Sequence, residues 1–594
     1  MTNELGARKF AFAVISDTHV NPDDDLCNSP FPVNARANRR FRHVIADLNT
    51  RKIEFVVHLG DLIHPVPSSG APYAKAAQAF KEIAADLRVP LHILPGNHDI
   101  GDTPIKGAPS GPIDQEGIDI WQAHFGAQYG AFSHDGIRYV LLNAQLLNSG
   151  LPAELEQKKW IEAELAATQE RVFLMLHHPA YICTPDETNH YDNTNAPARE
   201  WLLDLLVAHG VEAMFSGHAH NFWYNRYHAT DYYLAPSTSF VRQDYAEMAR
   251  ATPPANSEFG RDDSAKLGYF IVTIYEQGHT VQIIRTNGAE LAVNDTPAET
   301  APLGPTPREN TSPLIGFDLR KNWAELTDIP PSGGLDEFDR KVARNDYHLL
   351  SLIEMGVRNV RVPLSDLRDP LRFERLKHLA HLGLRLTLFG YEIPSKEDMA
   401  LVQKASSVLT DWEMTIDWSD FGTILDEIEQ AHAQSGLPIY LSRMRSKADI
   451  QTGGTYYHVI NHGFGPEDGN LLAALSGTCV SGAVFRLSRA DPVTETLSAI
   501  NRISRACDLQ ASVHLRTVGE NPAEAQEDEE TALQRVEDAM SFVQDHPGLR
   551  VFSEALVEVD RGYFPRIGAI DRNMNPTSFS RLVQAYHLAT ARPA

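Results

Sequence analysis

Five short apolar runs in the first 220 residues each end on side chains that can bind a metal ion. The runs are FAFAVIS, FVVHLG, PLHILPG, RVFLMLH and VEAMFSG, and each has the length of a buried strand. Helix-like stretches such as YAKAAQAFKEIAADL separate several of them, which is typical of a layered α/β domain. Because the carboxyl ends of strands in an open α/β sheet line one crevice, we expect the residues after the runs to meet there.

The residues that follow the runs offer imidazole, carboxylate and amide groups. They are, in chain order, Asp17 and His19; Asp61; Asn97, His98 and Asp99; His177 and His178; and His218 and His220. A single DxH or HxH pair is weak evidence, and GNHD can form an ordinary turn. Five such endings in one chain favour a metal centre over chance. Nitrogen and oxygen donors without thiolates suit manganese, iron, zinc or cobalt.

The motifs DTH, GDL, GNHD, HHP and GHAH, in that order, resemble those of the calcineurin-like metallophosphoesterase superfamily over about residues 8–290. This superfamily includes bacterial phosphodiesterases and purple acid phosphatases. The resemblance implies a layered α/β/β/α sandwich and a dinuclear centre with two transition metal ions. It places Asp17, His19 and His220 on one ion, Asn97, His177 and His218 on the other, and Asp61 between them as the bridging ligand.

Four further residues receive roles beside the metal ligands. His98 follows a ligand directly and cannot easily reach the same ion, so it resembles the family's general acid for the leaving group. Asp99 either orients His98 or caps a turn, and both interpretations stay open. His178 is expected near the substrate rather than on a metal. Arg242, which follows LAPSTSFV, is expected to contact the substrate phosphate.

The resemblance implies a metal-dependent phosphohydrolase that uses a hydroxide held between two ions. Its substrate is expected to be a small-molecule phosphate ester, with phosphodiesters preferred over monoesters. Three alternatives remain open: a phosphomonoesterase, a bifunctional enzyme with a sugar-handling second domain, and a catalytically silent binding module. A silent member would be expected to lose ligands, and this sequence retains the whole set.

A Pro-, Thr- and Glu-rich stretch at residues 294–313, NDTPAETAPLGPTPRENTSP, has no hydrophobic period and predicts a linker. It divides the chain into a metallophosphoesterase domain at 1–293 and a second domain at 314–594. In the second domain eight strand-like runs recur about every 34 residues with helical stretches between them, which predicts a (β/α)8 TIM-like barrel.

Charged residues stand at the ends of the expected barrel strands, where barrel active sites lie. They are Asp318, Arg320, Arg361, Glu392, Arg443, Arg486, His514 and Glu554. They could form a second ligand site, for instance for a sugar, or pair with one another as structural salt bridges. Because no motif accompanies them, the pattern slightly favours salt bridges.

Composition excludes several classes of partner. The net charge of −25 and the pI near 5.4 argue against a surface that binds nucleic acid. There is no apolar run near twenty residues and no signal-peptide pattern, so we expect no membrane association. The four cysteines form no CxxC pair, which favours the cytoplasm. A homo-oligomer remains compatible with the sequence.

Overall fold

The computed structural model describes residues 5–27, 29, 31–104, 108, 110–242, 245, 248, 264–296, 302–319, 323–329, 341–445, 461–517, 529–554, 556–559 and 566–590. The chain forms two compact units. The first unit comprises Met1–Pro302 and Leu326–Tyr347, and the second comprises Leu303–Glu325 and His348–Ala594. The chain therefore changes unit within the expected linker and returns to the first unit for residues 326–347.

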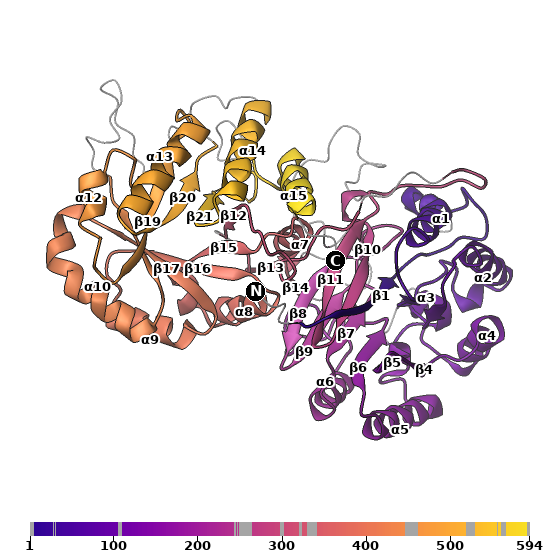
Figure 1. Cartoon of the computed structure of the whole chain (residues 1–594). Helices are drawn as coiled ribbons and strands as arrows, with labels where there is room; N and C mark the ends of the chain where they lie inside the picture. Colours follow the sequence, from indigo (N-terminus) through magenta and orange to yellow (C-terminus); the bar gives the residue numbers. More distant parts are fainter. Residues whose placement is uncertain are drawn as a thin grey trace. The chain divides into compact units, whose positions relative to one another are not determined.

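The first unit contains two sheets (Figure 1). One has the order β11-β10-β1-β2-β3 and consists of β1 (Arg8–Ile15), β2 (Val56–His58), β3 (Leu91–Ile93), β10 (Gly268–Tyr275) and β11 (Gly278–Arg285). The other has the order β4-β5-β6-β7-β9-β8 and consists of β4 (Gly130–His134), β5 (Ile137–Leu142), β6 (Arg171–Leu176), β7 (Ala213–Ser216), β8 (Trp223–Tyr227) and β9 (Thr230–Leu234). Within them, β1, β2 and β3 run parallel, as do β5, β6, β7 and β9.

The sheets pack face to face through aromatic side chains. Phe12 of β1 makes edge contacts with Tyr139 of β5 and Phe173 of β6, with ring centroids 5.2 and 6.1 Å apart. Six consecutive residues of β1, from Phe10 to Ile15, are buried, because one face of the strand meets the other sheet and the opposite face meets helices. This double burial explains why the strand is a continuous apolar run rather than an alternating one.

Helices cover the outer faces of the two sheets, as the α/β/β/α expectation requires. They are α1 (Ala37–Leu48), α2 (Ala71–Ala84), α3 (Asn97–Ile100), α4 (Gln115–Phe125), α5 (Pro152–Ala167) and α6 (Ala198–Ala208). Phe41 of α1 stacks on Phe80 of α2, and both rings contact His58 of β2. On the other side, Ile161 of α5 shares a core cluster with Leu174 of β6. The expected sandwich is confirmed.

Residues 326–347 complete the first unit. The hairpin of β13 (Leu326–Ile329) and β14 (Lys341–Arg344) places Ile329 and Ala343 in the same core cluster as Trp223 of β8. The indole Nε1 of Trp223 donates to the carbonyl of Arg344 at 2.7 Å. The guanidinium of Arg344 in turn donates to the side chain of Asn225 at 2.8 Å. This segment follows the first barrel strand in sequence but belongs to the sandwich.

The second unit is a closed barrel of eight parallel strands, so the expected TIM-like barrel is confirmed. Its strands are β12 (Gly316–Asp318), β15 (Asn359–Pro363), β16 (Arg385–Tyr391), β17 (Leu409–Ile416), β18 (Ile439–Arg443), β19 (Val480–Leu487), β20 (Gln510–Leu515) and β21 (Leu549–Ser553). The barrel closes where β12 pairs with β21.

Helices alternate with the barrel strands and surround them (Figure 1). They are α7 (Tyr347–Glu354), α8 (Pro370–His381), α9 (Lys396–Ala405), α10 (Phe421–Ser435), α12 (Gly469–Ala473), α13 (Val493–Ala506), α14 (Glu529–Asp545) and α15 (Ser578–Thr590). Among the residues that the structure describes, no helix of either unit has the length and apolar character needed to cross a membrane.

The hairpin's contribution to stability can be tested at a buried ion pair. Arg344 Nε lies 2.6 Å from Asp346 Oδ1, and both side chains are at most 8% exposed. Arg344→Met leaves the Asp346 carboxylate buried without this cation, so we expect a loss of about 3–5 kcal/mol in the unfolding free energy. Lys377→Met, which removes an exposed pair with Glu374, should cost less than about 1 kcal/mol. Equal urea midpoints for the two variants would contradict a structural role for the hairpin.

Candidate metal centre

The loops that follow five strands of the first unit bring seven potential ligands together. Asp17 and His19 follow β1, Asp61 follows β2, Asn97 begins α3 after β3, His177 follows β6, and His218 and His220 follow β7. Each of these side chains is buried. The strands' carboxyl ends thus meet at one place, as the sequence predicts.

One group of donor atoms consists of Asp17, His19, Asp61 and His220, which lie within 4.8 Å of one another. Nε2 of His19 lies 3.1 Å from Nε2 of His220, which is itself 3.2 Å from Oδ1 of Asp17. Oδ2 of Asp61 lies 3.5 Å from Nε2 of His19. Four donor atoms therefore surround a single point.

A second group forms around the other oxygen of Asp61. Oδ1 of Asp61 lies 3.5 Å from Nε2 of His177. Oδ1 of Asn97 lies 3.1 Å from that same Nε2 and 3.0 Å from Nδ1 of His218. Asp61, His177 and His218 again offer donor atoms within 4.8 Å of one another. The carboxylate of Asp61 is thus shared by the two groups.

The donor set fits cations. Nδ1 of His177 lies 2.8 Å from the carbonyl of Leu59, and Nδ1 of His220 lies 2.8 Å from the carbonyl of Phe240. These hydrogen bonds place the ring proton on Nδ1 and leave the Nε2 lone pair for a metal. Oδ1 of Asp17 is buried and has no hydrogen-bond partner among the described residues. An acceptor of this kind is explained by an ion that it ligates.

The protonation states expected for His19, His218 and Asp61 also suit ligands, whereas for His177 burial lowers the pKa but the Asp61 carboxylate raises it, to about 9. Burial lowers the pKa of His19 and of His218 well below the usual value, so both rings are neutral at pH 7. Burial alone would raise the pKa of Asp61, but His177 and the neighbouring imidazoles hold it well below its usual range. A neutral imidazole and an ionised carboxylate are the forms that bind metal.

Five of the seven ligand candidates have left-handed backbone conformations. Asp17, His19, Asp61, His218 and His220 have φ values between 45° and 67°. Residues other than glycine seldom adopt this region, and each instance costs about 1–3 kcal/mol. Such strain persists where the surrounding structure imposes it, and it is concentrated at functional sites. The clustering at these residues therefore supports a functional centre.

The glycines of the motifs are explained by close contacts. A Cβ atom on Gly96 would lie 2.2 Å from Oδ1 of Asp61, and one on Gly217 would lie 2.0 Å from Oγ of Ser16. The loops after β3 and β7 can approach the centre only because these positions lack side chains.

His98 lies at the edge of the cluster and is half-buried. Its backbone N–H donates to Oδ1 of Asp61 at 2.8 Å, and its Nδ1 lies 2.5 Å from the carbonyl of His64. The rings of His98 and His19 are in edge contact at 4.7 Å. Sequence reasoning missed His64, whose ring lies 4.9 Å from that of His98. The signal available was its position three residues after Asp61.

Asp99 contacts backbone amides. Its carboxylate accepts hydrogen bonds from the N–H groups of Leu62 at 3.0 Å, Ile63 at 3.2 Å and Gly96 at 2.8 Å. Burial and the nearby Asp61 carboxylate raise the pKa of Asp99 to about 8, although these amides oppose the shift. Asp99 joins the loops after β2 and β3, while the carbonyl of His64 holds the ring of His98. The contacts favour the turn-capping interpretation of Asp99.

The two residues expected to contact substrate are placed beside His218. The ring of His178 contacts that of His218 at a tilt of 31° with centroids 3.9 Å apart, and its Nε2 lies 2.7 Å from the carbonyl of Tyr191. Arg242 pairs with Asp192, and its guanidinium lies over the Tyr191 ring. In this structure both side chains contact protein groups that support the centre.

Asp192 is a buried carboxylate that sequence reasoning did not single out. Its Oδ1 lies 3.5 Å from Nε2 of His218, the ring atom opposite the one that faces Asn97. Its Oδ2 accepts from Nζ of Lys341 at 2.6 Å and from the hydroxyl of Tyr245 at 2.7 Å. Although burial raises the pKa of Asp192, Arg242 and Lys341 hold it well below its usual range. Lys341 of the hairpin thus contacts Asp192, which in turn lies beside the ligand candidate His218.

Comparisons with known proteins show a similarity over the first part of the chain. The sequence model of calcineurin-like phosphoesterases matches residues 10–222. The serine/threonine-protein phosphatase CPPED1 of Danio rerio is 32% identical over 181 residues, which are 28% of this chain and 54% of the relative. The chain thus spans about half the length of this relative.

A protein of Fibrobacter succinogenes named "Probable cyclic nucleotide phosphodiesterase" is 25% identical over 226 residues, 38% of this chain and 78% of the relative. In the solved structure of a dimetal phosphatase from Danio rerio, the sequence is 16% identical to this chain and the TM-score is 0.31. The matched region covers 47% of this chain and 96% of the phosphatase chain. Residues 10–222 thus match the model of calcineurin-like phosphoesterases and carry the motifs of that family in the same order.

Proposed function

We propose that the first unit hydrolyses phosphate esters with two metal ions, one in each donor group. The observation that carries the proposal is the shared carboxylate of Asp61, whose two oxygens each face a separate set of nitrogen and oxygen donors. Such donors suit manganese, iron, zinc or cobalt. When bound, a pair of ions would supply Lewis acidity toward the phosphoryl oxygens and would lower the pKa of the attacking water.

Hydrogen bonds within the chain keep the two donor groups in position. The backbone N–H of His98 orients the Asp61 carboxylate, and the amides around Asp99 fix the loops that carry both residues. The carbonyl of His64 accepts the Nδ1 proton of His98, which leaves Nε2 for proton transfer. We infer that His98 protonates the leaving oxygen, because its ring contacts that of His19 but it belongs to neither of the two groups that share Asp61.

We further propose that phosphodiesters are preferred, with monoesters as the second candidate. The cations Arg242 and Lys341 share the single carboxylate of Asp192, which balances one of their two positive charges. A diester group carries one negative charge fewer than a fully ionised monoester and requires less compensation. The relatives named above include both a phosphatase and a phosphodiesterase, so both substrate classes belong in the assay.

The shared role of Asp61 predicts a loss of metal and activity together. In Asp61→Asn we expect about one metal equivalent to be lost and most hydrolysis of an activated diester to disappear, because an amide bridges two cations poorly. Elemental analysis and turnover measure the two effects. Asp135→Asn, at an exposed site in the same unit, is the control. Two tightly bound ions and normal turnover in Asp61→Asn would refute the bridging assignment.

The general-acid role of His98 predicts a dependence on the leaving group. In His98→Ala, metal content should stay near normal while kcat for alkyl esters falls about 10²-fold to 10⁴-fold. Nitrophenyl esters, whose leaving groups need little protonation, should lose much less. His209→Ala, at the end of α6, serves as the control. Equal losses on both ester types would point instead to stabilisation of the phosphoryl oxygens.

The contact between Asp192 and His218 predicts an effect on metal affinity. Asp192→Asn removes the charge that faces the His218 N–H and should weaken metal binding about 10-fold to 100-fold, as for other supporting carboxylates. Competition with a fluorescent chelator measures the affinity. Asp204→Asn, exposed on α6, is the matched control. Unchanged metal affinity in Asp192→Asn would show that this carboxylate does not position His218.

A further inference from the structure

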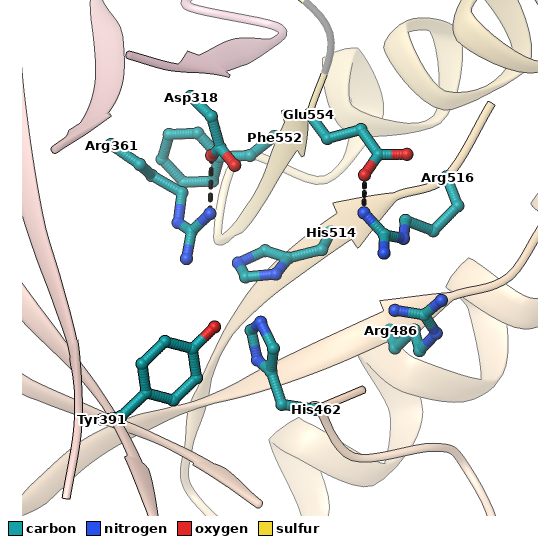
Figure 2. A pocket seen from close by; sticks show the side chains of 9 residues that line it. All are labelled: Asp318, Arg361, Tyr391, His462, Arg486, His514, Arg516, Phe552 and Glu554. Carbon is teal, nitrogen blue, oxygen red and sulfur yellow. Dashed lines mark hydrogen bonds and ion pairs between the residues drawn. The ribbon is translucent and has the colours of Figure 1, made fainter. Parts of the chain in front are cut away.

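Several of the charged residues at the ends of the barrel strands line a polar pocket, and the described contacts pair them with one another (Figure 2). Arg361 of β15 donates to Asp318 at 2.5 Å and to Glu413 at 2.7 Å, and Arg516 pairs with Glu554. For these residues the salt-bridge interpretation of the strand-end charges holds. Glu392 and Arg443 are not among the residues that line the pocket, and Arg320 lies outside the described residues.

In the first unit, the two ends of the Asn97 amide face different surroundings. Its Oδ1 lies 3.1 Å from Nε2 of His177 and 3.0 Å from Nδ1 of His218. Its Nδ2 lies 3.3 Å from Oγ of Ser110 and 3.4 Å from the hydroxyl of Tyr191. The oxygen thus faces the candidate ligand histidines of the second donor group, and the amide nitrogen faces two hydroxyl groups.

The orientation of this amide decides whether Asn97 can bind an ion. The amide oxygen has lone pairs, whereas the NH₂ group only donates hydrogen bonds, so a reversed side chain would repel a cation. A hydroxyl group can donate or accept, and Ser110 alone would therefore tolerate either orientation. The contacts of 3.3 and 3.4 Å are long for hydrogen bonds, so they act by selecting a direction rather than by their strength.

Asp102 gives the hydroxyl of Tyr191 a fixed direction. The hydroxyl donates at 3.3 Å to Oδ2 of Asp102, whose side chain is buried. Because a tyrosine has one hydroxyl proton and a carboxylate only accepts, the oxygen of Tyr191 is left as an acceptor for Nδ2 of Asn97. Burial and the Asp61 carboxylate raise the pKa of Asp102 to about 7. Ions bound beside Asp61 would offset this repulsion and favour the ionised form of Asp102.

Backbone contacts hold both residues in place. The N–H of Asp102 donates to the carbonyl of Gly111, and the carbonyl of Asp102 accepts from the N–H of Ile113, both at 2.7 Å. The carbonyl of Tyr191 lies 2.7 Å from Nε2 of His178. The loop after α3 and the loop that carries Tyr191 are thus fixed by contacts other than those to Asn97.

We propose that Asp102 and Tyr191 are positioning residues for Asn97, a role that rests on the proposed two-metal function. The carboxylate takes the proton of the tyrosine, the tyrosine oxygen accepts from the amide nitrogen, and the amide oxygen is thereby directed at the second donor group. Both residues act through Asn97 rather than by touching an ion or the substrate. The affinity for the second ion therefore depends on two residues outside the ligand set.

Titration of the full-length chain with Co²⁺ tests the role of Tyr191. Tyr191→Phe keeps the ring but removes the acceptor, so one of the two binding steps should weaken about 10-fold to 100-fold, as for other groups that support a ligand. The other step should stay unchanged. The visible absorption of the bound Co²⁺ should change as well, because it reports the ligands of the ion. Tyr129→Phe, at a half-buried ring just before β4, is the matched control and should leave both steps normal.

A double-variant cycle separates this role from a general effect on packing. Asp102→Asn should weaken the same binding step, because an amide at this position can donate to the tyrosine oxygen and free the tyrosine proton for Asn97. In the Tyr191→Phe background, Asp102→Asn should cause no further loss beyond about twofold, since it acts through the missing hydroxyl. Asp119→Asn, exposed on α4, is the control and should have no effect in either background.

Hydrolysis of phosphate esters by the unmodified chain is measured separately from binding. If two Co²⁺ ions bind but no ester is hydrolysed, the proposed function fails, whereas a weakened step in Tyr191→Phe still supports the positioning role. Normal binding of both ions by Tyr191→Phe, or losses from the two substitutions that simply add, would overturn the positioning role even in an active enzyme.

Discussion

The carboxylate of Asp61 stands between two groups of donors whose atoms face one another at about hydrogen-bond distance. Burying carboxylates and imidazole lone pairs together is costly unless cations compensate for the lost water. Much of the surrounding structure serves to keep these atoms in place. Backbone carbonyls orient the rings of His177 and His220, amides hold Asp99, and left-handed backbone turns aim the ligand candidates inward.

The residues of this centre that could be predicted from the sequence are those that directly follow a strand. Parallel strands deliver the residues after them to one edge, so the polar residues of the centre could be found from the apolar runs and the residues that end them. The resemblance to a known family then selects the seven ligand candidates among them. Supporting residues carry no such signal. Asp192 is one acidic residue in a polar loop, and Lys341 enters the first unit from beyond the expected linker. Their importance arises from tertiary contact with His218, which no local pattern encodes.

The same distinction applies to the barrel. Its eight strands could be predicted because each is an apolar run of suitable length, separated from the next by a helix. In the sequence, the hairpin of β13 and β14 resembles an ordinary connection between a strand and a helix. Its contacts with Trp223 in the structure assign it to the sandwich. At the barrel mouth, sequence could not decide between paired and ligand-binding charges. The structure places Arg361 in an internal network of charges and Arg486 on the wall of a pocket.

The return of residues 326–347 to the first unit has a consequence for folding during synthesis. When the ribosome has completed β11, the sandwich still lacks Ile329, Ala343 and the cation of Lys341. By the time this segment emerges, strand β12 of the barrel has already been made. The first unit therefore cannot finish folding before synthesis of the second has begun, and contacts that join distant parts of a chain form slowly. A break at the linker would separate the sandwich from one of its own pieces, so the two units are not interchangeable modules.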